Sequence, residues 1–514
     1  MNYEGWGFAY PFFYGMEAFA SSLSLLSGID SLIVMVMLIP ALTAFLVLPI
    51  FFIVRKIFHD HNVALLASLF VSVSPAGVFA TSHPMPGALG DLLGLMVFYF
   101  YLELRPGRWA TWLLIILSIS ALMVTHHMSA YFVFISLGFY TLLREIIKRT
   151  HPYELRRDAA VLYFFIIFMS LYWLVAVEPF KERIVDRAFA VSGWYIMSGA
   201  VLLLTLIFYL LRMRRRWKWY YQPHYPDASH LIRMLFVVGL PVFFIMLSIA
   251  IIGVPGTSIE VDTSFLLLVL PLLFMIILAA PAPGFLRFYS KGLFIYAWLG
   301  AITLSMVAMT AMKSTVLLPY RHTQYLLEPL LILSAVGLRE LYRYLPIGEG
   351  FSSRLIATIM AVLLSLGVGY SAYPPREVIG NFQEGTLYLE MEGVYWIREY
   401  ADDFSRGKEG KIATDHRMSS LIFGVAGVKA TWDSAYDTLY ARDYKNCSEE
   451  IYRLNITGVF MDREIVKGAA MLQWENALPI SRESQEKFEA PPFIRLVDTG
   501  FFQVYYVGKQ KGTV

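Results

Sequence analysis

The sequence has little cysteine and little charge. Cys447 is the single cysteine among 514 residues, which excludes an internal disulfide framework, a cysteine-based zinc site and an iron–sulfur cluster. Charged residues make up 16% of the chain, whereas a soluble protein has about 25%. This shortage excludes a cytosolic globular enzyme and a disordered chain. The net charge of +3 is too small for polyanion binding, so nucleic acid is not an expected partner.

Two sequence signals are also missing: residues 1–7 contain no basic segment typical of a cleavable signal peptide, and the chain shows no internal repeat. The membrane spans themselves are therefore expected to direct insertion. Hydrophobic residues make up 57% of the chain, and a span needs about 17–25 of them in a run. We expect a mostly α-helical, multi-pass protein of about 12 transmembrane helices. The candidate spans are residues 31–54, 63–80, 89–104, 109–125, 128–147, 159–177, 194–211, 231–252, 264–280, 292–312, 325–344 and 354–372.

The charge is divided unevenly along the chain. Residues 373–514 contain 38 charged side chains in 142 positions, and residues 1–372 contain 43 in 372. We therefore predict three parts: an apolar interfacial segment at residues 1–30, a transmembrane domain at 31–372, and a soluble α/β domain at 373–514.

The basic residues indicate the orientation. If residues 31–54 run from outside to inside, the inner loops and span ends carry 20 Lys and Arg residues and the outer ones carry 5. The positive-inside rule then predicts a cell-membrane protein with its C-terminal domain outside the cytoplasm. Twelve spans also place the N-terminus outside, which is unusual and favours a first span missing from this chain.

Polar residues collect at the predicted outer turns, where ionisable groups are functional candidates. A carboxylate there can act as a general base on an acceptor hydroxyl, and Asp91, Glu17 or Glu4 can supply it. Cations can stabilise a phosphate leaving group. The candidate cations are His83, His126, His127, Lys313, Arg321 and His322.

Several of these candidates also have a purely structural interpretation. Asp91 can cap the start of a helix, and Arg321 can extend to the membrane interface. His126 and His127 can be structural polar residues at a tight turn. As neighbours in the chain they point apart, which argues against one metal ion held by both.

The tail shows alternating helix and strand patterns. Helical spacing covers residues 386–400, 418–423 and 448–454, short strands are expected near 411–415, 428–431 and 456–462, and residues 493–507 are typical of a hairpin. Asp415 and Arg417 follow one predicted strand and Asp462 ends another. Ligands of open α/β sheets bind at such ends. The alternative is that these residues form ion pairs that close the strand ends.

The whole arrangement resembles the GT-C superfamily of membrane glycosyltransferases, and archaeal members in particular. This superfamily includes protein O-mannosyltransferases, lipid A aminoarabinose transferases and oligosaccharyltransferase catalytic subunits. Four segments carry the resemblance. They are Tyr10-Pro11-Phe12-Phe13 of the first outer loop, His83 to Asp91 of the second outer turn, Thr125-His126-His127-Met128-Ser129, and Arg321 to Leu338, a late span that opens with a basic residue.

The resemblance implies a sugar donor linked to a polyprenyl (dolichyl) phosphate, used at the outer face. Together with the polar residues at the outer turns, it leads us to predict Asp91 and Glu17 as catalytic candidates, with the donor phosphate near Arg321, His322, His126, His127 and Lys313. His83, Asp415 and Arg417 are the candidates for binding the protein, lipid or glycan acceptor. No cofactor is firmly expected, and a magnesium or manganese ion stays open.

The chain departs from the superfamily at two places. The usual catalytic aspartate of the first outer loop and the span before it are absent, which implies an N-terminal truncation, a shift of catalysis to another carboxylate, or an inactive protein. The oligosaccharyltransferase motif Trp-Trp-Asp-Tyr-Gly is also absent, and Thr431-Trp432-Asp433-Ser434-Ala435-Tyr436 only partly matches it.

Two other functional classes remain open. Glu328, inside the predicted span 325–344, is consistent with a transporter or lipid flippase, whose polar residues lie near the bilayer midplane. A non-catalytic membrane scaffold with a partner-binding tail is the third class. The ionisable residues lie mostly at the outer rim, which favours the glycosyltransferase.

Overall fold

The computed structural model describes residues 12–82, 85–148, 152–177, 225–252, 263–286, 288–311, 321–344, 351–373, 387–405, 409–432, 435–468 and 479–508. The chain divides into two compact units. One is a helical unit, Ala9–Pro374, and the other is a tail unit, Pro375–Val514 together with Met1–Phe8.

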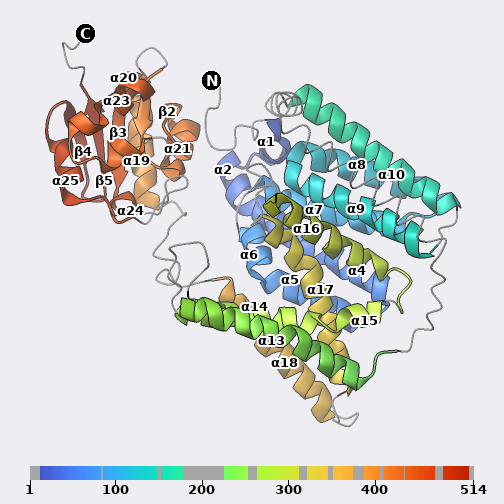
Figure 1. Cartoon of the computed structure of the whole chain (residues 1–514). Helices are drawn as coiled ribbons and strands as arrows, with labels where there is room; N and C mark the ends of the chain where they lie inside the picture. Colours follow the sequence, from blue (N-terminus) through green and yellow to red (C-terminus); the bar gives the residue numbers. More distant parts are fainter. Residues whose placement is uncertain are drawn as a thin grey trace. The chain divides into compact units, whose positions relative to one another are not determined.

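The helical unit consists of long apolar helices (Figure 1). Its main helices are α1 (Gly15–Ser27), α4 (Val47–Phe58), α5 (His61–Val73), α6 (Pro75–Ser82), α7 (Pro86–Glu103), α8 (Trp109–Thr125), α9 (His127–Lys148), α10 (Pro152–Leu171), α13 (Ala228–Ile252), α14 (Thr263–Ala279), α15 (Ala282–Leu286), α16 (Leu293–Ala311), α17 (Arg321–Tyr344) and α18 (Phe351–Ser371). A continuous helical run also leads from Ser31 into α4 through α2 (Ser31–Ile33), η2 (Val34–Leu38), α3 (Ile39–Thr43) and η3 (Ala44–Leu46).

Local sequence signals explain several helix boundaries. The Asp60 side chain accepts hydrogen bonds from the backbone of Asn62 and Val63, which caps the start of α5. Between α5 and α6, Pro75 lacks the backbone N–H that would continue a helix, so the chain turns at Ser74. The end of α5, the start of α7, the α8–α9 junction and the start of α17 meet at one end of the bundle.

Helices α7, α9, α16 and α17 pack around a shared apolar core. The Phe98 ring of α7 meets the Trp298 ring of α16 edge-on, with centroids 4.9 Å apart. Phe132 of α9 lies against Tyr325 of α17 at 4.2 Å. This core positions the polar groups described in the next subsection.

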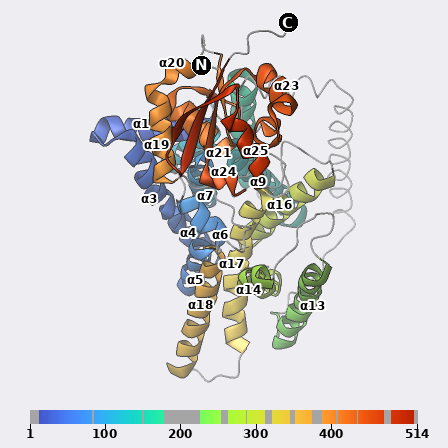
Figure 2. The ribbon, with the colours of Figure 1, turned by 90° about the vertical axis from the view of Figure 1, so that its left-hand side faces the viewer.

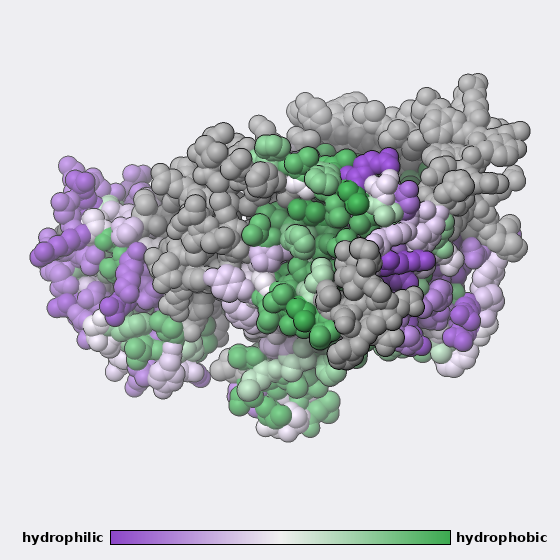
Figure 3. All heavy atoms as spheres, turned by 90° about the horizontal axis from the view of Figure 1, so that it is seen from below, coloured by the Kyte–Doolittle hydropathy of each residue, from purple (hydrophilic) through white to green (hydrophobic). Residues whose placement is uncertain are grey.

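Ten of the twelve predicted spans coincide with continuous helical runs. The predicted span 63–80 is wrong as a single helix, because the chain turns at Ser74 and divides it into α5 and α6, and the span at residues 194–211 lies outside the described residues. Within the described ranges, three helices are long and apolar enough to cross a membrane: Val34–Phe58, His127–Ile147 and Leu293–Thr310. One face of the molecule shows hydrophobic residues gathered over the helical unit (Figure 3). The helical unit therefore contains apolar helices of the kind that cross membranes. The number of twelve spans stays a prediction.

The tail unit is an α/β domain built on a mixed five-stranded sheet in the order β2-β1-β3-β5-β4. The strands are β1 (Lys411–Ala413), β2 (Lys429–Ala430), β3 (Ile456–Asp462), β4 (Phe493–Asp498) and β5 (Phe502–Val507). β1 pairs in parallel with β2 and β3, while β5 is antiparallel to β3 and β4. Every residue of β3 is buried, as expected for a central strand with helices on both faces.

Helices cover both faces of this sheet, with α19 and α20 to one side and α23 and α25 to the other (Figure 2). The helices are α19 (Tyr388–Glu399), α20 (Ala401–Ser405), α21 (His416–Leu421), α22 (Tyr436–Tyr440), α23 (Tyr444–Leu454), α24 (Arg463–Val466) and α25 (Arg482–Glu486), with η5 (Ile422–Ala426) and η6 (Lys487–Glu489). The predicted helices at 386–400, 418–423 and 448–454, the three strands and the hairpin are all found. The short helices α20, α22, α24 and α25 were not predicted, because one or two turns carry too little periodicity.

Candidate functional site

Three glycines on α7 allow the site to form. A Cβ atom built on Gly90 would lie 2.7 Å from the Cβ of His126, and one on Gly94 would lie 2.9 Å from a methyl group of Val133. Gly87 likewise faces the His126 ring. Small residues let the backbones of α7 and α9 approach closely, and this approach brings Asp91 within reach of the start of α9.

Asp91 lies in the second turn of α7, and its side chain is 6% exposed. Its Oδ1 accepts a hydrogen bond from the Ser129 hydroxyl at 2.9 Å. Its Oδ2 accepts one from the Gln324 amide at 2.6 Å. Both carboxylate oxygens therefore act as acceptors, and helices α9 and α17 fix the position of the side chain.

Ser129 joins two further groups to Asp91 in one network. Its Oγ lies 2.9 Å from the Tyr325 hydroxyl and 2.8 Å from Nδ1 of His126. Four helix ends thus contribute to a buried polar cluster, which we call the Asp91 cluster: Asp91, His126, Ser129, Gln324 and Tyr325. Buried polar groups are rarely left without such partners.

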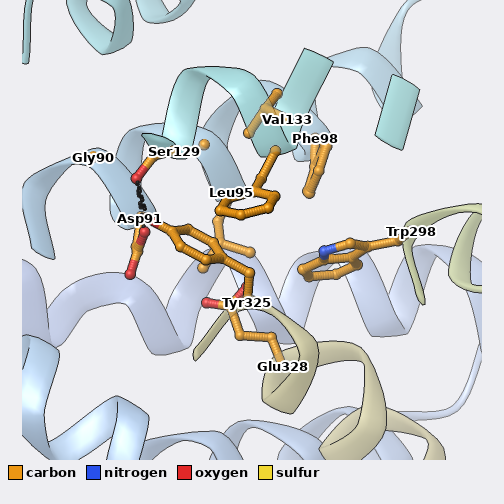
Figure 4. A pocket seen from close by; sticks show the side chains of 11 residues that line it. Gly90, Asp91, Leu95, Phe98, Ser129, Val133, Trp298, Tyr325 and Glu328 are labelled. Carbon is orange, nitrogen blue, oxygen red and sulfur yellow. Dashed lines mark hydrogen bonds between the residues drawn. The ribbon is translucent and has the colours of Figure 1, made fainter. Parts of the chain in front are cut away.

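Two cavities adjoin the Asp91 cluster. Both are small. One is lined by Asp91, Ser129, Tyr325, Glu328 and the aromatic side chains of Phe98, Phe132 and Trp298 (Figure 4). The other lies against the α5–α6 turn and is lined by Ser74, Gly77, Asp91, Gln324 and Glu328. Asp91 and Glu328 line both cavities, so the two carboxyl groups lie between them.

The structure brings some of the predicted outer-face residues together. Asp91 and His126 belong to one cluster, joined through Ser129. The capping interpretation of Asp91 is wrong, because Met85 occupies the N-cap position of α7. His126 and His127 do lie at a turn, where α8 ends and α9 begins.

Other candidates lie beside the cluster or away from it. The His127 ring lies 4.8 Å from that of Phe13. His322 is fully buried, and its Nε2 lies 2.9 Å from the Ser305 hydroxyl. Glu17 is an exposed side chain on α1 and does not belong to the cluster. His83, Lys313 and the side chain of Arg321 lie outside the described residues, although Arg321 is the first residue of α17.

Sequence reasoning missed Ser129, Gln324 and Tyr325 as functional residues and treated Glu328 only as an argument for transport. Two signals in the sequence could have indicated them. The glycine spacing 87/90/94 marks one close-packed helix face. Polar residues recur at positions 324, 325 and 328, which lie on one face of the late span that begins at residue 321.

In the tail unit, Arg417 forms the centre of a second polar group. Its guanidinium donates to Glu390 at 2.5 Å and to Asp462 at 2.6 Å, and it lies 3.5 Å from Asp415. All four side chains are buried. As predicted, the parallel strands β1 and β3 bring Asp415, Arg417 and Asp462 to the same edge of the sheet. We call these four residues the Arg417 cluster.

Trp432 lies at the same edge, after β2. Its backbone has a φ of 57°, in the left-handed region that residues other than glycine rarely adopt. Its backbone N–H donates to the Ser419 hydroxyl at 3.0 Å, which holds the turn in place. Asp433 and Ser434, which continue the partial match to the Trp-Trp-Asp-Tyr-Gly motif, lie outside the described residues.

In the Arg417 cluster one guanidinium faces three carboxylates. This imbalance affects the protonation of the carboxyl groups. Burial raises the pKa of Asp462 to about 7, against the lowering effect of Arg417. In the unfolded chain an aspartate has a pKa of about 3.9. The folded tail therefore binds a proton more readily than the unfolded one, and this stabilising contribution is lost as the pH rises from about 4 through about 7.

We expect the stability of the tail to fall as the pH rises from 5 to 8, and Asp462→Asn to reduce this slope. The buried thiol of Cys447 reports opening of the tail in the full chain. Its reaction with 4,4′-dithiodipyridine would be measured at each pH against the unfolded protein, because the reactive thiolate fraction of an exposed cysteine rises with pH. An equal slope in both proteins would contradict the prediction.

Within the described ranges, no group of three or more His, Cys, Asp or Glu side chains is placed to hold a metal ion. The described residues therefore offer no site for the magnesium or manganese ion that the sequence left open.

The fold is shared with a known enzyme. The archaeal oligosaccharyltransferase AglB from Archaeoglobus fulgidus, in complex with an inhibitory peptide and a dolichol-phosphate, matches with a TM-score of 0.54 at 12% identity. The apo form of the oligosaccharyltransferase from the same organism matches with a TM-score of 0.55 at 13% identity. Each match covers 88% of this chain and 61% of the other. The chain thus spans less than two thirds of the length of these structures.

No protein-family model matches the sequence, and no curated protein matches it. Because the sequence identities are low, the matches show a similarity of fold alone. The chain has the fold of an archaeal oligosaccharyltransferase, and the resemblance to the GT-C superfamily is confirmed at the level of the fold.

Proposed function

We propose that this protein is a membrane glycosyltransferase that takes a sugar from a polyprenyl-phosphate-linked donor. The observation that carries the proposal is the Asp91 cluster, a buried set of polar groups beside two cavities at one end of an AglB-like helical unit. Buried ionisable residues within apolar helices are costly and therefore mark functional sites.

The positions of the cluster residues fit a reaction near one membrane face. Asp91 lies in the second turn of α7 and Gln324 in the first turn of α17, and His126 directly precedes α9. Arg321, His322, His126, His127 and Lys313 are the proposed contacts of the donor phosphate, because cations stabilise a phosphate leaving group. Asp91 is the proposed source of negative charge beside the sugar carbon, where positive charge develops as the bond to phosphate breaks.

The proposal also includes the membrane face on which the reaction takes place and the class of the acceptor. The excess of basic residues in the predicted inner loops supports a site on the outer face of the cell membrane, with the tail outside the cytoplasm. The A. fulgidus enzyme was solved with a peptide and a dolichol-phosphate, which supports a protein acceptor and a dolichyl donor here. His83, Asp415 and Arg417 stay the proposed acceptor-binding residues, and a lipid or glycan acceptor is the alternative.

The test is the release of sugar by the full chain in liposomes. The donors would be polyprenyl phosphates carrying glucose, mannose or N-acetylglucosamine, with water or serine-, threonine- and asparagine-containing peptides as acceptors. We expect release from at least one donor. We also expect Arg321→Ala to raise the donor concentration for half-maximal rate roughly tenfold, the cost of one charge-assisted hydrogen bond. No release from any donor would overturn the proposal.

A transporter or lipid flippase is the second candidate. The observation that favours it is the pair of carboxyl groups, Asp91 and Glu328, that line both cavities, since such groups bind protons or ions in transporters. Movement of intact polyprenyl-phosphate sugar between leaflets, without release of sugar, would favour this candidate over the glycosyltransferase.

A further inference from the structure

We infer that Glu328 holds a proton beside Asp91, so that any negative charge at this site falls on Asp91, and that water in the two cavities links the two carboxyl groups. The inference rests on the proposed function, in which Asp91 is the source of negative charge near the sugar carbon. It gives Glu328 a positioning role, because this residue acts through Asp91 and not on the sugar.

The two carboxyl groups meet at the cavities beside the Asp91 cluster. Asp91 and Glu328 line both cavities, and Figure 4 shows the two side chains at the first of them. Each cavity has room for about one water molecule. A water molecule in either cavity therefore lies against both carboxyl groups.

The hydrogen bonds of the two carboxyl groups differ. Asp91 accepts one from the Ser129 hydroxyl at 2.9 Å and one from the Gln324 amide at 2.6 Å. Hydrogen bonds donated to a carboxylate favour its ionised form. Glu328 forms no hydrogen bond or ion pair with any residue that the structure describes. Because no protein donor stabilises an anion at Glu328, its protonated form is favoured over that of Asp91.

The surroundings of Glu328 also offer no counter-ion. Among the described residues that line the two cavities, no Arg, Lys or His occurs. The other ionisable group in this lining is Tyr325, whose hydroxyl lies 2.9 Å from that of Ser129. His126 joins the cluster through Ser129 and lines neither cavity. Two buried carboxyl groups without a cation resist ionising together, so the pair keeps a proton.

Water completes the connection between the two groups. A protonated Glu328 donates one hydrogen bond, which a water molecule in either cavity accepts. The same water molecule donates to Asp91, because a carboxylate has room for more than the two hydrogen bonds that Asp91 already accepts. Glu328 thus holds the proton that would otherwise neutralise Asp91.

Infrared spectroscopy of the full chain tests the inference without a substrate. The protein would be measured in a detergent free of carbonyl groups at pH 8, well above the range in which exposed carboxyl groups hold protons. We expect the C=O stretching band of a protonated carboxyl group in the wild type. Glu328→Gln should remove this band and Asp91→Asn should leave it in place. Transfer to D₂O should shift the band, because water in the cavities exchanges the proton.

The matched control is Glu340→Gln on the same helix. Glu340 is a buried carboxylate of α17 that lines neither cavity, and Arg339 donates to it at 2.6 Å. Because this ion pair keeps Glu340 ionised, Glu340→Gln should leave the band unchanged. The amide bands of the same spectra report the helix content of each variant, so a loss caused by unfolding is visible.

Three infrared results would contradict the inference. The wild type may show no such band at pH 8, which needs no variant to interpret. A band that survives Glu328→Gln and disappears in Asp91→Asn places the proton on Asp91. A band that D₂O leaves unshifted contradicts the link through water.

Sugar release in liposomes gives a second measurement. Glu328→Leu removes the proton donor and should lower the rate at saturating donor roughly tenfold, the cost of one hydrogen bond to a charged group. Glu328→Gln should recover most of this loss, because glutamine is neutral and still donates a hydrogen bond. Equal losses in both variants would overturn the inference. No release by the wild type from any polyprenyl-linked sugar would overturn the proposed function, whereas the infrared spectra would still show which residue holds the proton.

Discussion

Asp91→Asn is expected to reduce sugar release by roughly 100- to 1,000-fold, the usual loss when one electrostatic contact to a transition state is removed. Asparagine keeps the shape of the side chain. After the Gln324 amide rotates, asparagine can also keep both hydrogen bonds that now hold Asp91, at 2.9 Å to Ser129 and 2.6 Å to Gln324. The variant therefore removes the charge and leaves the packing, and the expected loss is in the rate at saturating donor.

The matched control for this variant is Glu154→Gln, which neutralises a half-exposed carboxylate on α10. It should leave the rate near that of the wild type. Both proteins would be compared by size-exclusion chromatography in detergent before the assay. If Asp91→Asn releases sugar as fast as Glu154→Gln, Asp91 takes no part in the reaction and the proposed site is wrong.

Arg417→Met is expected to have the largest effect on stability. The Arg417 side chain is 4% exposed and lies among three carboxylates that are at most 1% exposed. Removing one partner of a buried ion pair typically costs about 3–5 kcal/mol, because the remaining charges have neither water nor a counter-ion. Methionine fills similar volume, so the loss reports the charge rather than a hole in the core.

The thiol of Cys447 measures this loss. It is fully buried in α23, and no second cysteine competes with it. Since about 1.4 kcal/mol corresponds to a factor of ten, labelling at neutral pH should be roughly 100- to several thousand-fold faster in Arg417→Met than in the wild type. Lys467→Met, at an exposed position of the same unit, is the control and should change the labelling rate little.

Acid should partly rescue the Arg417 variant. Protons neutralise the carboxylates that the missing guanidinium no longer balances, so the difference between Arg417→Met and the wild type should narrow as the pH falls from 8 to 5. A difference that is constant with pH would show that packing, and not charge, explains the loss of stability.

The architecture of both units was largely accessible from the sequence. The tail elements follow the alternation of strand and helix patterns, and β3 begins and ends at the predicted residues Ile456 and Asp462. Parallel neighbours end at the same sheet edge, so Arg417 and Asp462 could be placed together. Glu390, from a helix at the start of the tail, could not be added to them, because no local pattern encodes its contact with Arg417 across 27 residues.

The Asp91 cluster was only partly accessible, for the same reason. Apolar runs indicate which residues form helices and which ends face the same side, and this was enough to group Asp91 with His126. Which faces of the helices meet depends on close packing between segments far apart in the chain. The contact between Ser129 and Tyr325 spans 196 residues, and hydrophobic periodicity contains no information on such a pairing.

Ser129 has one hydroxyl proton to share among three neighbours. When that proton points to Asp91, the Ser129 oxygen can only accept from Tyr325 and from Nδ1 of His126. The same Nδ1 lies 3.2 Å from the backbone N–H of Ser129, from which it accepts only in the other tautomer. The tautomer of the imidazole and the direction of the hydroxyl therefore depend on each other, and through these hydrogen bonds the turn between α8 and α9 is coupled to the carboxylate of α7.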